Sequence, residues 1–345
     1  MFEILGLYGI PEPIIEAIKI LYTDTSATIM TPDGETSPID IVAGILQGDT
    51  LAPFLFIIVL DYVLRMSLDH MNTNGLQLHP RKSSRHPAIH LTDADFADDI
   101  ALISHSLKNA QALLSSLESA ANCVGLYLNE SKTEYISFSQ TEDTFEIKTL
   151  SNTILKRVDD YKYLGSYIST SAKDFNTRKG MAWSACNDLN KIWTSKLDTK
   201  IKVDIFRATV EPILLYGSET WTLPVKLEKR LDGCYTRLLM RVKHLSWKKH
   251  PTLQQIYGEL SPASSLVKAR RTQFAGHCHR ASKEIISPLI LWKPVANGRR
   301  RRKLTYPDVI SRDTGIAIDD LRTAMEDREV WKSFVKSIVS TAVEK

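Results

Sequence analysis

The segment AIHLTDADFADDIALIS, residues 88–104, constrains the fold more than any other part of the chain. Apolar and β-branched residues flank a short polar centre, a pattern that predicts strand, turn, strand. Asp93 and Asp95 alternate with apolar neighbours, which favours the solvent side of the first strand. Asp98 and Asp99 fall in the turn and offer the oxygen ligands that Mg²⁺ prefers. Because Asp is also a common turn residue, the pair alone does not establish a metal site.

Composition limits the class of protein. The chain has 345 residues, of which 43% are hydrophobic and 24% charged, so it is long enough for two or three ordinary globular domains. Its four cysteines lack Cys-x-x-Cys spacing, so neither a disulfide framework nor a cysteine zinc site is expected. We therefore expect a nuclear or cytoplasmic protein. The longest apolar run, near residues 54–64, is shorter than a membrane span and contains Asp61, so no membrane partner is expected.

Charge is distributed very unevenly along the chain. Between Lys226 and Lys303 there are 19 Lys or Arg and 4 Asp or Glu, a net charge of +15. The rest of the chain has 25 basic and 36 acidic residues, a net charge of −11. A concentrated basic segment interleaved with aromatic residues is typical of a protein that binds a polyanion such as nucleic acid.

The order of predicted elements indicates an α+β fold. Residues 1–170 mix helices with short strands, which suits helices packed on a mixed sheet. Residues 171–245 have mainly helical periodicity. Residues 246–345 form a basic C-terminal region, helical in places and interrupted by Pro and Gly.

Local signals refine this outline. Residues 32–34, Pro-Asp-Gly, predict a tight turn between two short strands. Ser106 is a predicted N-cap for a helix that ends at Gly125. Phe96 is expected to be a core residue.

Four motifs appear in a fixed order along the first half of the chain. They are GILQGDTLAPFLF at 44–56, FADD at 96–99, GLYLNESKTEY at 125–135 and YKYLG at 161–165. In this order they resemble successive motifs of the reverse transcriptases of non-LTR (LINE-type) retrotransposons. The resemblance is strong over residues 1–170 and weaker beyond. It implies an incomplete right-hand palm, a helical thumb-like region and a basic C-terminal region, with the boundaries given above.

The resemblance also implies roles for single residues. Asp98 would bind Mg²⁺, or Mn²⁺ in its place, with Asp99 as a supporting ligand, and no zinc is expected. Lys132 would lie near the triphosphate and protonate or stabilise the pyrophosphate leaving group. Gln47 and Gly48 would lie against the template and the incoming nucleotide. The same Gln-Gly pair also suits a simple turn before a helix, and Lys132 an exposed strand lysine.

Tyr163, Leu164 and Gly165 would form a primer grip that positions the attacking 3′-hydroxyl. The implied partners are an RNA template, a DNA primer and deoxynucleoside triphosphates. A buried strand end is the alternative interpretation of the same three residues.

The sequence departs from the family in one respect. Such a palm carries a further catalytic Asp at the end of an apolar strand, and Asp24, Asp33 and Asp40 do not fit that context. We therefore expect an N-terminally truncated polymerase that is inactive in isolation, since the loss of one metal-binding carboxylate removes several kcal/mol of transition-state stabilisation.

The C-terminal region carries weaker signals. His277, Cys278 and His279 are adjacent, which does not suit a tetrahedral zinc site. A run of basic residues suits either a phosphate-contacting arm or a nuclear localisation signal. This run consists of Arg299, Arg300, Arg301, Arg302 and Lys303. The alternative function for the whole chain is a non-catalytic RNA- or DNA-binding protein derived from such an element.

Overall fold

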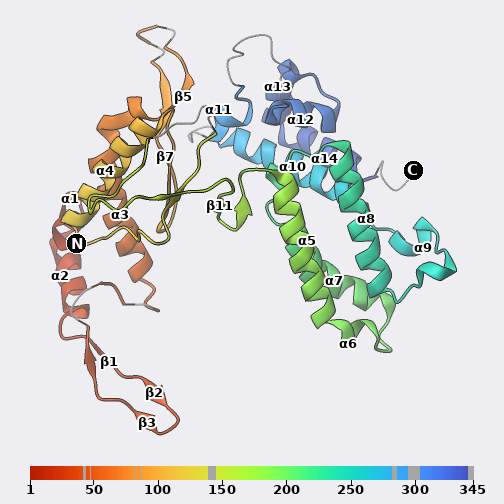
Figure 1. The fold of residues 1–345 in the computed structure, drawn as a ribbon, viewed down its shortest axis with the longest axis horizontal. Helices are drawn as coiled ribbons and strands as arrows, with labels where there is room; N and C mark the ends of the chain where they lie inside the picture. The colour runs from red at the N-terminus through yellow and green to blue at the C-terminus, as the bar shows by residue number, and fades with distance from the viewer. Residues whose placement is uncertain are drawn as a thin grey trace. The chain divides into compact units, whose positions relative to one another are not determined.

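The computed structural model describes residues 1–41, 44–46, 48–81, 83–85, 87–138, 145–281, 286–293 and 304–340. The chain divides into two compact units, Met1–Asp159 and Asp160–Lys345 (Figure 1). Helices and short strands mix in the first unit, and helices dominate the second, which fits the predicted α+β class. The predicted divisions at 170 and 245 remain predictions.

Four α-helices and one 3₁₀ helix build the framework of the first unit. They are α1 (Phe2–Leu7), α2 (Glu12–Leu21), α3 (Ala52–Leu68), η1 (Asp69–Asn74) and α4 (Leu107–Cys123). Leu5 and Leu55 are buried where α1 and α2 cover one end of α3. The Ser106 side chain accepts a hydrogen bond from the Asn109 backbone N–H, which confirms the predicted N-cap of α4.

The strands of the first unit pair two by two. They are β1 (Ser26–Ala27), β2 (Met30–Thr31), β3 (Gly34–Glu35), β4 (Ile39–Asp40), β5 (Leu76–His79), β6 (Ile89–Leu91), β7 (Asp93–Phe96), β8 (Asp99–Leu102), β9 (Glu134–Tyr135) and β10 (Lys156–Arg157). The antiparallel pairs are β1–β4, β2–β3, β5–β6 and β7–β8, and β9–β10 is parallel. Among the described residues these pairs do not join into the continuous mixed sheet that was expected.

Two of these pairs share one run of chain. Only Thr92 separates β6 from β7, so β5 pairs with the first half of the run and β8 with the second. An isolated antiparallel bridge between Gly75, just before β5, and Ser104, just after β8, links the ends of these two strands. At Gly75 a Cβ atom would lie 2.5 Å from the carbonyl oxygen of Leu91, so only glycine fits this approach. The carboxylate hairpin is thereby continuous with β5–β6.

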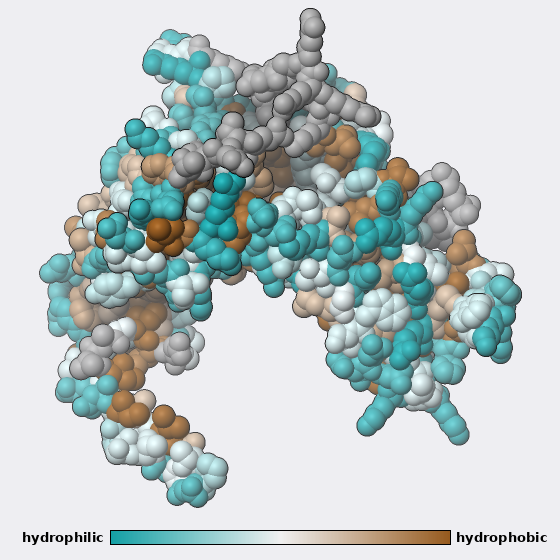
Figure 2. All heavy atoms as spheres, in the orientation of Figure 1, coloured by the Kyte–Doolittle hydropathy of each residue, from teal (hydrophilic) through white to brown (hydrophobic). Residues whose placement is uncertain are grey.

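The β1–β4 and β2–β3 pairs form an arm that extends from the helices of the first unit (Figure 1). Its two-residue turn at Pro32 and Asp33 confirms the predicted tight turn. Ile29, Met30 and Ile39 are exposed on the arm, and hydrophobic surface is visible along it in Figure 2.

The second unit is a helical assembly that begins with a short hairpin, β11 (Lys162–Tyr163) and β12 (Ser166–Tyr167). Its α-helices are α5 (Ser171–Asp188), α6 (Asn190–Trp193), α7 (Thr199–Leu214), α8 (Val225–Val242), α9 (Leu253–Tyr257), α10 (Ala263–Arg280), α11 (Ile286–Ile290), α12 (Tyr306–Thr314), α13 (Leu321–Glu326) and α14 (Arg328–Ser340). Its 3₁₀ helices are η2 (Ser218–Thr220), η3 (Trp247–Lys249) and η4 (Ile318–Asp320). No described helix in either unit is both long and apolar enough to span a membrane.

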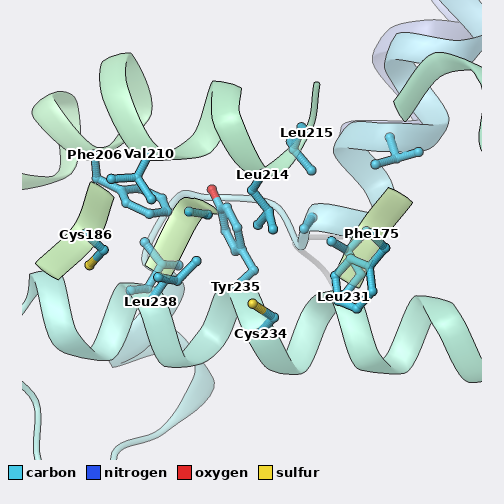
Figure 3. Packing of buried hydrophobic residues seen from close by; sticks show 14 of the residues in the cluster. Phe175, Cys186, Phe206, Val210, Leu214, Leu215, Leu231, Cys234, Tyr235 and Leu238 are labelled. Atoms are coloured by element: carbon cyan, nitrogen blue, oxygen red, sulfur yellow. The ribbon is translucent and has the colours of Figure 1, made fainter. Parts of the chain in front are cut away.

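The main core of the second unit lies between α5, α7 and α8 (Figure 3). Phe206 and Val210 of α7 face Tyr235 and Leu238 of α8 in this core. The hydroxyl of Tyr235 donates a hydrogen bond to Glu211 Oε2 at 2.6 Å. Burial, reinforced by the Glu211 carboxylate, raises the pKa of Tyr235. This polar pair is therefore satisfied inside an otherwise apolar core.

A second core forms around α10, which contacts α11, α12, α13 and α14. The indole Nε1 of Trp331 donates a hydrogen bond to the carbonyl oxygen of Thr272 at 2.7 Å. Gly276 lies one turn further along α10, and a Cβ atom there would lie 2.3 Å from the Trp331 ring. Glycine is thus required at this helical position by the close approach of α14.

We predict that Gly276→Ala lowers the free energy of unfolding by about 1 to 3 kcal/mol, because the added methyl group overpacks the contact with Trp331. Calorimetric unfolding measures this change. Gly180→Ala in α5 is the matched control, because nothing lies within 4 Å of a Cβ atom at Gly180. The control should gain about 1 kcal/mol from the better helix propensity of Ala. Equal stabilisation by both substitutions would contradict the packing role of Gly276.

Candidate functional site

The predicted carboxylate hairpin is present as β7 and β8. Phe96 pairs with Asp99, so Ala97 and Asp98 form a two-residue turn. Ala97 adopts a φ of 52°, a left-handed conformation that costs a non-glycine residue about 1 kcal/mol. Asp98 is exposed at the tip, and Asp99 is exposed at the start of β8. The turn therefore presents two neighbouring carboxylates to solvent.

Phe96 is not the core residue that was expected. Its side chain is 64% exposed. The physical reason is that β7 has only β8 as a partner, so Phe96 sits at the end of a two-stranded ribbon instead of inside a layered sheet. The apolar character of Phe96 indicated burial. Burial would have required a wider sheet around β7, and the described residues form only the β7–β8 pair there.

Asp93 and Asp95 lie two residues apart and line a pocket of about 370 Å³. Asp61, Arg65 and Asp69 contribute further polar side chains to this pocket. Desolvation, followed by a hydrogen bond and repulsion from Asp93, raises the pKa of Asp95 to about 7. The Asp95 side chain remains exposed, as expected for the solvent side, while Asp93 is half-buried.

The Asp61 carboxylate accepts a hydrogen bond from Arg65 Nε at 2.7 Å and another from the hydroxyl of Tyr8. Desolvation acts to raise the pKa of Asp61, but these hydrogen bonds and the Arg65 charge outweigh it and hold the pKa below its usual range. The pocket therefore contains one ion-paired carboxylate, Asp61, beside Asp95, whose raised pKa means that it keeps its proton more readily than an isolated carboxyl group does.

The two nucleotide-contact motifs of the first unit lie in loops. Gly48 has a φ of 94° in the loop before α3, and nothing lies within 4 Å of a Cβ atom there. Glycine is therefore favoured at this position by the positive φ and not by close packing. Gln47 lies outside the described residues. Lys132 is exposed in a turn just before β9, where its backbone N–H donates to the carbonyl oxygen of Asn129 at 3.1 Å.

The predicted primer grip is a second tight hairpin turn, and it belongs to the second unit. Leu164 and Gly165 connect β11 to β12 with φ values of 47° and 84°. The hydroxyl of Tyr216 donates to the carbonyl oxygen of Leu164 at 2.9 Å, and Arg178 Nη2 donates to that of Gly165. The Arg178 guanidinium also stacks on the Tyr216 ring, 4.1 Å from its centroid. Side chains from α5 and from the segment that follows α7 therefore hold this turn.

Sequence reasoning missed Arg178, Tyr216 and Gly217 as supports of this turn. Gly217 has a φ of 68°, and a Cβ atom there would lie 2.3 Å from Ser166 Oγ. The segment YGSETW, residues 216–221, contained the available signal, because it places an aromatic residue beside a glycine at the end of a helix. That pattern does not predict that these residues support the β11–β12 turn, which lies about fifty residues earlier in the sequence.

The C-terminal candidates are placed only in part. Cys278 and His279 are buried on α10, whereas His277 is exposed. Among the residues that the structure describes, no three His, Cys, Asp or Glu side chains form a group suited to a metal ion. The basic run from Arg299 to Lys303 lies outside the described residues.

The first half of the chain matches a known protein family. Residues 4–168 match the family described as "Reverse transcriptase (RNA-dependent DNA polymerase)". The matched region contains the β7–β8 hairpin, Gly48, Lys132 and the β11–β12 turn.

Curated relatives come from transposable elements. A putative uncharacterized transposon-derived protein of Caenorhabditis elegans is 28% identical, over 71% of this chain and 95% of its own length. A retrovirus-related Pol polyprotein from a type-1 retrotransposable element R2 of Popillia japonica is 25% identical, over 69% of this chain and 33% of its own length. A Pol polyprotein from a type-2 element of Drosophila melanogaster is 27% identical, over 48% of this chain and 15% of its own length. The chain thus spans nearly all of the first relative but a third or less of these two polyproteins.

We predict that Asp95→Asn stabilises the protein at pH 8 and has no such effect near pH 4. In the folded state Asp95 binds a proton up to a pH of about 7, whereas the unfolded state releases it near 3.8. Because the folded state binds more protons between these values, wild-type stability falls as the pH rises through this window. Urea unfolding followed by circular dichroism at the two pH values measures the difference.

The control for this prediction is Asp33→Asn in the turn between β2 and β3, where the carboxylate is exposed. It should show the same small effect at both pH values. A pH-independent effect of Asp95→Asn would contradict the coupling between Asp95 and Asp93.

Proposed function

Because residues 4–168 belong to the reverse transcriptase family and the resemblance to non-LTR retrotransposon enzymes is confirmed, we propose that this chain serves RNA-directed DNA synthesis. The reaction class is nucleotidyl transfer from a deoxynucleoside triphosphate to a primer 3′-hydroxyl. The proposed partners are an RNA template, a DNA primer and the nucleotide. The observation that carries the proposal is the two-residue turn that presents Asp98 and Asp99 together.

The carboxylates at this turn fit a divalent cation. Mg²⁺ in nucleotide-dependent enzymes is held through one or two carboxylates together with phosphate oxygens and water. Asp98 is exposed at the tip and would be the principal ligand, with Asp99 beside it in support. When bound, Mg²⁺ or Mn²⁺ would favour ionisation of the attacking hydroxyl and stabilise the departing oxygen. The left-handed conformation of Ala97 allows the two-residue turn that places Asp98 at the tip.

Other residues would position the substrates. Gly48 would let the loop before α3 approach the incoming nucleotide closely, because it carries no side chain at a positive φ. Lys132 would supply a positive charge, and a proton, to the pyrophosphate leaving group. The rigid Leu164–Gly165 turn would hold the primer end so that its 3′-hydroxyl meets the nucleotide in line.

We propose further that the 345-residue chain by itself binds these partners without extending a primer at a measurable rate. Two-metal nucleotidyl transfer requires at least one carboxylate from a second element beside the hairpin pair. No group of three such side chains is present in the described part of the chain.

The alternative is a nucleic-acid-binding protein without catalysis. The basic character of residues 226–303 supports it. Neutralising Arg299 to Arg302 should weaken RNA binding under this alternative, whereas Asp98→Asn should leave RNA binding unchanged and affect only metal and nucleotide binding.

We predict that Asp98→Asn weakens Mn²⁺ binding in the presence of a deoxynucleoside triphosphate by at least about tenfold, since a charged ligand is lost. Electron paramagnetic resonance of free Mn²⁺ measures the binding. Asp33→Asn is a matched control, because Asp33 is the second residue of an exposed two-residue turn, as Asp98 is. Equal Mn²⁺ affinity in the wild type and the Asp98 variant would overturn the metal assignment.

We predict no measurable primer extension by the purified 345-residue chain on an RNA template with Mg²⁺. Among the described residues no further metal-binding side chain joins the hairpin pair, and the lack of one such carboxylate removes several kcal/mol of transition-state stabilisation. Gel analysis of a labelled primer measures extension. Mg²⁺-dependent extension that Asp98→Ala abolishes would refute this prediction and would show that the chain contains every carboxylate that the reaction needs.

A further inference from the structure

A cationic pocket lies between α5 and α8 in the second unit, apart from the candidate residues described above. Its volume is about 260 Å³. Six residues line it: Phe175, Lys179, Lys229, Arg230, Gly233 and Arg237. Four of the six carry a positive charge, and none carries a negative charge. Phe175, which is fully buried in the main core, forms an apolar wall (Figure 3).

The charges of α8 are sorted by face. Lys229, Gly233 and Arg237 are spaced four residues apart, so they share the face that lines the pocket. Glu228 and Asp232 share a different face. Glu228 pairs with Lys268 of α10 at 3.2 Å, and Asp232 accepts hydrogen bonds from the backbone N–H and hydroxyl of Ser264 at 2.8 Å. The acidic side chains of this stretch are thus committed to α10, away from the pocket.

Among the described residues none of the four pocket cations forms an ion pair, although other basic residues of this unit do. Like charges at helical spacing destabilise a helix by a few tenths of a kcal/mol per pair. An anion bound in the pocket would offset the repulsion among these four positive charges.

Two contacts fix the geometry of Arg230. Its Nη2 donates a hydrogen bond to Asn176 Oδ1 at 2.7 Å. Its guanidinium carbon lies 5.5 Å from the centroid of the Phe175 ring. A planar guanidinium held in place loses little freedom when it donates two parallel hydrogen bonds to phosphate oxygens.

Gly233 leaves the pocket open. Nothing lies within 4 Å of a Cβ atom at this position, so the glycine is not required by packing. A glycine inside a helix costs about 1 kcal/mol relative to Ala. The space above Gly233, between Lys229 and Arg237, is where an anion has access to both charges.

From these features we propose that the α5–α8 pocket binds a phosphate group of a nucleic-acid backbone. The proposal rests on the proposed function for its ligand class, because a template or primer is the polyanion available to such a chain. The surrounding segment from Lys226 to Lys303 continues the positive charge beyond a single phosphate. Binding at the pocket is independent of sequence, since it reads the backbone and not the base edges.

The test measures RNA binding by the full chain as a function of salt. A fluorescein-labelled single-stranded RNA of mixed sequence is titrated by anisotropy between about 0.05 and 0.3 M salt. The double variant Lys179→Gln/Lys229→Gln removes two pocket charges. The control Lys196→Gln/Lys200→Gln removes two exposed charges that do not line the pocket.

The pocket variant should lower the slope of log K against log salt by about one, because one phosphate contact is lost. At about 0.1 M salt its affinity should fall between about tenfold and a hundredfold. The control should change affinity by no more than about twofold, because distant exposed charges are screened. Gly233→Glu, which places a carboxylate inside the pocket, should reproduce the loss with the helix intact by circular dichroism.

The possible outcomes separate the two proposals. Equal losses in the two double variants, with wild-type RNA binding intact, overturn the pocket assignment alone. An absence of wild-type RNA binding at low salt overturns the proposed function. Calorimetric binding of inorganic phosphate that the pocket variants abolish, together with unchanged RNA affinity, would identify a free-anion site and also overturn the proposal.

Discussion

The arrangement of the second unit depends on one buried ion pair, Arg271 with Asp313. Both side chains are fully buried, and Arg271 Nε lies 2.9 Å from Asp313 Oδ2. Arg271 Nη1 also donates to the carbonyl oxygen of Trp221. Burying two charges is costly unless each is paired and hydrogen-bonded, and breaking such a pair costs about 3 to 5 kcal/mol. α10 and α12 can therefore pack only in a register that keeps this pair together, which specifies a single arrangement of the C-terminal helices.

The polar contacts continue from this pair toward the predicted primer grip. The indole Nε1 of Trp221 donates to Asp174 Oδ2 at 2.9 Å, and the backbone N–H of Tyr167 donates to Asp174 Oδ1 at 3.2 Å. Arg178 lies 3.9 Å from the same carboxylate and reaches the carbonyl oxygen of Gly165. The β11–β12 turn is thus supported by a chain of buried hydrogen bonds that begins more than a hundred residues later in the sequence.

Local signals predicted local structure well. The Ser106 cap, the Pro-Asp-Gly turn and the Asp98 hairpin each depend on residues a few positions apart, and the structure contains all three. Long-range contacts were not predictable in the same way. Phe96 is exposed because its ribbon has one partner strand, and Gly276 is required because Trp331, 55 positions away, packs against it. Neither the exposure of Phe96 nor the need for glycine at position 276 follows from the residue type alone. Both depend on which elements, distant in the sequence, pack against each other.

Both hairpin tips in the motifs have a non-glycine residue in the left-handed region, Ala97 in one and Leu164 in the other. The left-handed region costs such a residue about 1 kcal/mol that glycine would avoid, so each tip is held against the local preference of its own residue. The flanking strand pairs, β7–β8 and β11–β12, supply the energy that maintains the two turns. A glycine at either tip would relieve this strain and widen the range of conformations that the tip can visit, so the two turns exchange some stability for a narrower range of backbone conformations.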